Sequence, residues 1–140
     1  MENLKINHAA VWVGVVVMFA LGFLWYSVLF GEQWMNFVGL DMATMDADSA
    51  HIGTWISNIV SSVLSVYLLA WLFVKLNITS GFKGALIGFL IAFIFIFLTT
   101  MVNNMFAQSP YGLAWITGGF SMVGFTINGF ILGAWTKKSN

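Results

Sequence analysis

The chain has 140 residues, of which 60% are hydrophobic and only 7% are charged. Because a soluble domain usually carries about 25% charged residues, this composition excludes a water-soluble protein. The sequence contains no cysteine, which excludes disulfides and thiolate chemistry. Its formal net charge is zero and it has no arginine, so it offers no basic patch to a nucleic-acid partner.

Four uncharged, apolar stretches are long enough to cross a bilayer, which takes roughly 20 residues of α-helix. They are residues 9–31, 52–74, 84–107 and 111–136. The first stretch exceeds the apolar core of a signal peptide, about 7–15 residues, and lacks a small-residue cleavage site, so we interpret it as a retained helix. The sequence therefore predicts an all-α membrane protein with one domain, residues 1–140, in which four transmembrane helices form an up-down bundle.

The lysines indicate the orientation of this bundle. If the helices alternate in direction, all five lysines fall on one side and four of the carboxylates on the other. Because cytoplasmic loops are enriched in lysine and arginine, both termini are expected in the cytoplasm, with the loop 32–51 outside.

The outer loop 32–51 is expected to begin with an interfacial segment. Gly31 is predicted to be the C-cap of the first helix. The residues that follow mix polar side chains with Trp34 and Phe37, which is typical of a segment lying at a membrane surface. Asp46, Asp48 and His51 could bind a cation weakly, but an acidic, loosely ordered loop is the favoured interpretation, and no metal site is predicted.

Small residues recur on single faces of the last two helices. Helices pack in lipid through small residues and interhelical hydrogen bonds, because no hydrophobic force joins them there. The predicted helix-packing positions are Gly84, Gly88, Ala92, Gly124, Gly129 and Gly133.

Hydroxyl and amide side chains gather toward the outer ends of the helices. This polar outer-half cluster comprises Tyr26, Ser27, Thr54, Asn58, Thr99, Asn103 and Asn104. Two interpretations remain open: these residues hold the helices together, or they line a path for water or a solute. Asn103 is expected to face the interior of the bundle and to meet Asn58 or Tyr26.

No Asp, Glu, Lys or Arg lies within the four predicted spans. Proton relays, ion-coupled transporters and voltage sensors place such groups at membrane depth, so those mechanisms are not expected. No spacing of serine, histidine and acidic residues suggests a catalytic site. The sequence predicts neither an enzyme nor a cofactor.

The stretch Leu24–Trp34 reads LWYSVLFGEQW, and it resembles the signature of the domain of unknown function family 1761. Trp25, Phe30, Gly31 and Trp34 form this interfacial motif. Asn103-Asn104-Met105-Phe106, ahead of a glycine-rich last helix, is also similar to that family. The resemblance implies a small bacterial protein with four helices, located in the cytoplasmic membrane, and it implies no activity.

The functional hypothesis from the sequence is a homo-oligomeric passive channel or carrier for a small neutral or weakly charged solute, open at its outer side. The alternative is a non-transporting structural protein, or one that binds a lipid or another apolar ligand. Membrane lipids are the expected partners in both cases.

Overall fold

The computed structural model describes residues 3–40 and 52–139, and most of them are helical. The order of elements is β1 (Leu4–Lys5), α1 (His8–Phe23), η1 (Leu24–Leu29), α2 (Gly31–Val38), α3 (Ile52–Lys75), α4 (Gly81–Ile91), η3 (Ala92–Phe97), α5 (Leu98–Phe106), α6 (Tyr111–Ala134) and β2 (Lys137–Lys138). The elements η1 and η3 are π-helical turns within longer helices. In the described part of the chain, four helical segments are long and apolar enough to cross a membrane, namely His8–Leu29, Ile52–Lys75, Gly81–Phe106 and Tyr111–Ala134. The predicted all-α, multi-pass membrane fold is confirmed.

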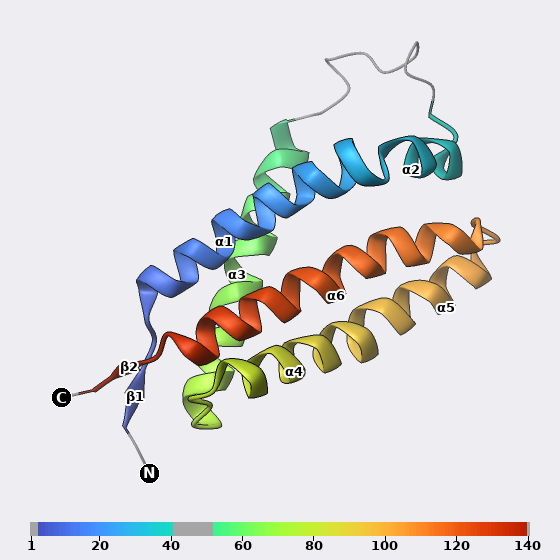
Figure 1. Cartoon of the computed structure of the whole chain (residues 1–140). Helices are drawn as coiled ribbons and strands as arrows, with labels where there is room; N and C mark the ends of the chain where they lie inside the picture. The colour runs from blue at the N-terminus through green and yellow to red at the C-terminus, as the bar shows by residue number, and fades with distance from the viewer. Residues whose placement is uncertain (1–2, 41–51, 140) are drawn as a thin grey trace.

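Helix α6 is the centre of the molecule. The continuous helix α4–η3–α5 runs beside it along its whole length, and α1 packs on another side (Figure 1). Helix α4 approaches α6 closely because glycines lie at the contact between the two helices. A Cβ atom on Gly84 would overlap the backbone carbonyl of Gly129, and one on Gly88 would overlap that of Phe125. Backbones can approach this closely in a membrane only where side chains are absent.

The apolar core lies in the half of the bundle nearer the two chain ends, which we call the termini end. It combines side chains from α1, α3 and α6: Ala10, Val11, Val15, Met18, Val66, Leu69, Ala70, Phe73 and Leu132. A hydrogen bond of 2.9 Å between His8 Nδ1 and the Tyr67 hydroxyl joins α1 to α3 at the same end. The described residues of this half therefore form a packed apolar core.

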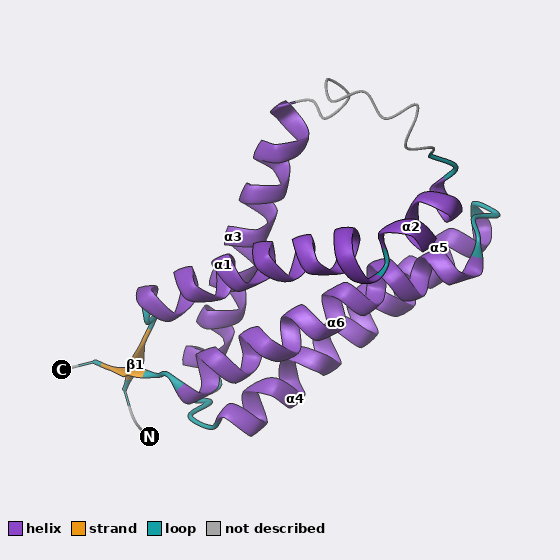
Figure 2. Ribbon diagram, turned by 45° about the horizontal axis from the view of Figure 1, so that its top comes forward, coloured by secondary structure: helices purple, strands orange, loops and turns teal. Residues whose placement is uncertain are grey.

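The first half of α3 leaves the bundle. Residues 52–61 are all exposed, whereas Val66 and Phe73, further along the helix, are buried. Figures 1 and 2 both show α3 diverging from α1 toward the opposite end, which we call the α2 end. We refer to residues 52–65 as the splayed half of α3. This half is amphipathic: Ile52, Ile56, Ile59, Val60 and Leu64 are exposed along one side of the helix, and serines, Thr54 and Asn58 form a polar stripe on the other.

The two chain ends are tied together. β1 and β2 pair in an antiparallel register, with Leu4 opposite Lys138 and Lys5 opposite Lys137. Asn7 connects this strand pair to the helices. Its Nδ2 donates to the carbonyl of Trp135 at 3.1 Å, and its Oδ1 accepts from the N–H of Ala10 in the first turn of α1. Both termini therefore lie at one end, as Figure 1 shows.

The prediction that Gly31 caps the first helix is wrong. That helix ends at Leu29, and Gly31 is the buried first residue of α2. Glycine is required there because a Cβ would lie 2.7 Å from the carbonyl oxygen of Tyr26. The left-handed C-cap belongs to Gly39, with φ 74°, at the end of α2.

The interfacial segment predicted after the first helix corresponds to α2. This helix is amphipathic, with Glu32 and Gln33 exposed and Trp34 and Phe37 partly covered. Asp46, Asp48 and His51 lie outside the described residues. Among the helix bounds, the largest difference from prediction is at α4, which begins at Gly81 and not at residue 84. Ser80 caps it by accepting from the N–H of Lys83 at 3.4 Å.

Candidate functional site: a cleft and a groove on the two sides of η1

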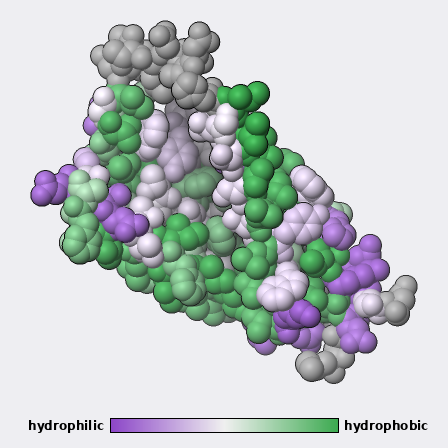
Figure 3. Space-filling view, turned by 180° about the vertical axis from the view of Figure 1, so that it is seen from behind, coloured by the Kyte–Doolittle hydropathy of each residue, from purple (hydrophilic) through white to green (hydrophobic). Residues whose placement is uncertain are grey.

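The divergence of α3 opens a cleft between it and the first helix. The cleft has a volume of about 560 Å³ and is lined by Met18, Phe19, Gly22, Phe23, Tyr26, Ser27, Trp55, Asn58, Ser62 and Phe120. Figure 3 views the molecule from the side of α3 and shows a hollow between two arms, with a wall that is largely pale and not green. The cleft is thus a surface of mixed polarity in a mostly apolar molecule.

The chemistry of the cleft is neutral hydrogen bonding between aromatic walls. Tyr26 and Ser27 bring hydroxyl groups from η1, while Asn58 and Ser62 bring an amide and a hydroxyl from α3. The Tyr26 ring is fixed by Phe120 on one side and Trp34 on the other, at centroid distances of 5.5 and 5.9 Å. None of the described residues that line the cleft is Asp, Glu, Lys or Arg.

The cleft is closed toward the termini end. Met18 lies in its wall and is also part of the apolar core. The sulfur of Met18 fits over Gly124, where a Cβ would approach it to 2.6 Å. Beyond Met18 the described residues of α1 and α3 are in contact and belong to the apolar core, so the cleft ends there.

A second concavity lies across η1 from the cleft, and we call it the groove. It measures about 530 Å³ and is lined by Trp25, Phe30, Phe89, Trp115, Ile116, Gly119, Met122, Val123, Thr126 and Ile127. The hydroxyl of Thr126 donates within its own helix, to the Met122 carbonyl at 2.6 Å, and leaves the groove apolar.

The interfacial motif builds one wall of the groove. The indole Nε1 of Trp25 donates to the carbonyl of Ile116 at 2.9 Å, and the rings of Trp25 and Phe30 lie 4.7 Å apart. Gly119 provides space for the indole, because a Cβ there would lie 3.2 Å from it. The motif thus ties η1 to α6, with Gly31 and Trp34 holding α2 against Tyr26.

The π-helix η3 overturns the placement of Asn103. In a regular helix the stripe Gly84–Gly88–Ala92 would continue to Thr99 and Asn103. Instead η3 accommodates one extra residue: the N–H of Leu98 bonds the carbonyl of Phe93, five residues back, and burial passes from Ala92 to Phe97. Thr99 and Asn103 are therefore exposed, while their neighbours Thr100 and Asn104 are partly covered.

The polar outer-half cluster is consequently split. Tyr26, Ser27 and Asn58 meet in the cleft, and Thr54 is exposed on the splayed half without lining it. Asn103 meets neither Asn58 nor Tyr26, because α5 packs on α6 away from α3 (Figure 1).

Seven residues that line the cleft are absent from the predicted site: Met18, Phe19, Gly22, Phe23, Trp55, Ser62 and Phe120. Ser62 stands on the polar stripe of α3 and could have been included from its helical spacing. Phe120 carries no signal of its own, since an aromatic residue in a membrane span is ordinary.

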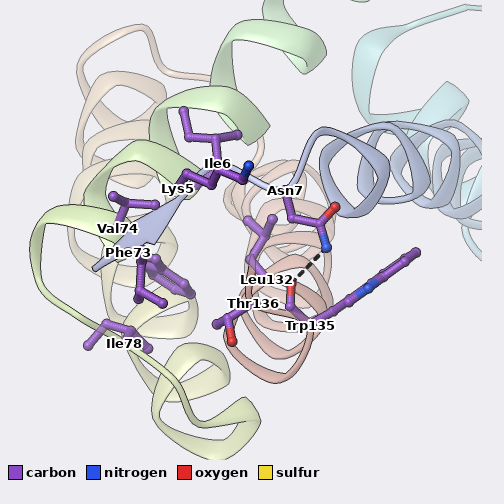
Figure 4. A pocket seen from close by; sticks show the side chains of 11 residues that line it. Lys5, Ile6, Asn7, Phe73, Val74, Ile78, Leu132, Trp135 and Thr136 are labelled. Carbon is purple, nitrogen blue, oxygen red and sulfur yellow. Dashed lines mark hydrogen bonds between the residues drawn. The ribbon is translucent and has the colours of Figure 1, made fainter. Parts of the chain in front are cut away.

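A third cavity, at the termini end, is too small for a ligand. Figure 4 shows it between the strand β1 and the ends of α3 and α6, beside the hydrogen bond from Asn7 to Trp135. Its volume of about 20 Å³ is suited to a single water molecule. The cleft and the groove, at about 560 and 530 Å³, lie in the usual size range of small-molecule sites and are the candidate sites.

The sequence profile of the family described as protein of unknown function DUF1761 matches residues 9–133. This range includes both sides of the cleft and of the groove. No curated protein and no solved structure matches the chain. Because the profile covers most of the chain, the chain belongs to the DUF1761 family.

Proposed function

We propose that this membrane protein is a non-enzymatic carrier that binds a small neutral or weakly charged solute in the cleft. The observation that carries the proposal is the cleft itself, in which four hydroxyl or amide side chains face an uncharged space of about 560 Å³. Small-molecule sites commonly measure about 300–1,000 Å³ and combine apolar walls with a few placed polar groups. The closure at Met18 favours a carrier over an open channel.

Asn58 provides the most direct test of this proposal. We expect Asn58→Leu to lower the flux of a transported solute into proteoliposomes by about 3- to 10-fold, because one hydrogen bond contributes about 0.5–1.5 kcal/mol. Stopped-flow light scattering with a panel of small polyols, amides and urea would measure the flux. The matched control is Thr54→Leu, one helical turn away on the exposed surface.

A panel in which no solute crosses faster than into empty vesicles would contradict the carrier proposal. Equal effects of the Asn58 and Thr54 substitutions would also contradict it, because only Asn58 lines the cleft.

We propose that the cleft opens to the outside of a bacterial cytoplasmic membrane, with both termini in the cytoplasm. Lys5, Lys75, Lys83 and Lys137 all lie at or near the termini end, and the positive-inside rule assigns that end to the cytoplasm. Since the chain has no cysteine, Gln33→Cys and Ser139→Cys can be labelled singly in whole cells. An impermeant maleimide is expected to label position 33 only, and the opposite pattern would reverse the orientation.

We also propose a homo-oligomer, with a second copy covering the splayed half of α3. In hydrocarbon the exposed hydroxyls of Ser57 and Ser61, which do not line the cleft, need partners, and the same residues on another copy can supply them. Native mass spectrometry of the purified protein would count the copies. The lipids around the bundle are its other proposed partners.

The groove favours a second candidate function, the binding of an apolar ligand or a lipid chain without transport. Its lining is almost wholly apolar, and tryptophan and phenylalanine rings form its walls. Mass spectrometry of molecules that copurify with the protein discriminates between the two functions. A single apolar compound at a fixed ratio, without any solute flux, would support the groove function.

A further inference from the structure

Asn128 is an amide in the apolar core. Its side chain is 2% exposed, and it is the single buried polar side chain among the described residues. Its Nδ2 donates to the carbonyl of Gly124 at 3.0 Å, while its Oδ1 has no hydrogen-bond partner among the described residues. Buried amide oxygens in proteins almost always have a partner, so this orphan acceptor calls for a donor.

A small cavity adjoins Asn128 on the side of α3. It has a volume of about 10 Å³ and is lined by Met18, Ser65, Val66, Leu69, Phe125 and Asn128. This is about the smallest space that holds one water molecule, and a buried water also needs at least two polar partners. Asn128 and Ser65 supply them from two different helices. We propose that this cavity is a binding site for one water molecule, or for a hydroxyl group of similar size, held between Asn128 and Ser65.

Met18 separates this inner site from the cleft. The same side chain lines both spaces. Methionine is unbranched and flexible, and the sulfur of Met18 occupies the space that a Cβ on Gly124 would need. The inner site is therefore a second polar position that follows the cleft on the way into the core. The water site stands on its own geometry, whereas its exchange with the cleft rests on the proposed carrier function.

The competing arrangement is a dry one. Gly14 faces Asn128 so closely that a Cβ would overlap Oδ1, and a weak Cα–H···O contact could then be the whole environment of this oxygen. That contact would use only one of the two lone pairs of Asn128 Oδ1. It would also leave the Ser65 hydroxyl beside an empty cavity. The two arrangements differ in whether water is present beside Phe125.

X-ray radiolytic labelling in nanodiscs distinguishes these arrangements, because hydroxyl radicals formed from a bound water oxidise the side chains next to it. Met18 lines both the inner site and the cleft, and Tyr26 lines the cleft alone. Phe125 lines the inner site and, with Ser65, a separate hollow of about 190 Å³ that Asn128 does not line, so dependence on Asn128 is what identifies the inner water. We expect all three to be labelled in the unaltered protein. Asn128→Leu and, independently, the conservative Ser65→Ala should lower the labelling of Phe125 severalfold and leave that of Tyr26 unchanged.

Unlabelled Phe125, or labelling that neither substitution alters, would overturn the inner water site. If Tyr26 still reacts in that case, the wet cleft survives and only the inner site is lost. If Phe125 reacts in an Asn128-dependent way while Tyr26 does not, the inner site stands and the carrier proposal fails. Ser65→Ala removes one oxygen from a partly exposed position, so the test does not depend on the folding of Asn128→Leu.

Discussion

Gly88→Leu is expected to prevent assembly of the bundle. Any side chain at position 88 would enter the backbone of α6 at Phe125, and backbone cannot move aside as a flexible side chain can. Extra methylene groups in a well-packed interior usually cost about 1–3 kcal/mol, and this site should lie at or above that range. Thermal unfolding in detergent, followed by circular dichroism, together with size-exclusion chromatography, would measure the loss.

Gly53→Leu is the matched control. Gly53 is also a helical glycine in a predicted span, but a Cβ there meets no described atom within 4 Å. The control should remain monodisperse and unfold at the temperature of the unaltered protein. If Gly88→Leu behaved like the control, the contact between α4 and α6 described here would be wrong.

Deletion of a single residue is expected to have opposite consequences in two helices. Removing Val123 from α6 rotates Gly124, Asn128 and Gly129 by about 100° relative to the first half of the helix. The two halves could then no longer face α4 and η3 together, so no folded protein should be recovered. Removing Phe95 from η3 should be tolerated, because a regular helix would then place Ala92 and Phe97 four residues apart, on the same face.

Both deleted residues are exposed, so lost burial cannot explain a difference between the two deletions. The yield of monodisperse protein and its unfolding temperature provide the measurement. If both variants lost yield and stability equally, the π-helical turn of η3 would have a role beyond setting which side of α5 faces α6. Equal tolerance would contradict the central position of α6.

The sequence predicted the number, order and approximate bounds of the helices, because a run of apolar residues long enough for a bilayer is a strong signal. It did not predict which side of α5 faces the protein. That prediction extended the Gly84–Gly88–Ala92 stripe at regular helical spacing, and η3 shifted the phase by one residue before Asn103. A π-helical turn has no reliable mark in a single sequence, since it is set by packing on both of its sides.

The cleft was only partly predictable, for a related reason. The serines and Asn58 of α3 identified a polar face, but a polar face is equally consistent with helix packing and with a solute path. Whether the polar face packs against a helix or lines a cleft depends on the angle between α3 and α1. That angle depends on tertiary contacts such as the one between His8 and Tyr67. The groove could not be predicted, because it forms where Trp25 contacts Ile116 and Gly119 of α6. Residue spacing in one sequence does not reveal a contact between segments so far apart in the chain.

The central place of α6 has a consequence for biosynthesis. The helix that contacts α1, α3 and the α4–η3–α5 helix is also synthesised after the other three spans. The first three spans must therefore wait in the bilayer, individually stable as helices but without their main packing partner. Pairing of β2 with β1 can follow only after that, once Lys137 and Lys138 have emerged. The bundle can therefore close only after α6 has been inserted, and a chain that stalls before α6 would expose the glycine face of α4 to lipid.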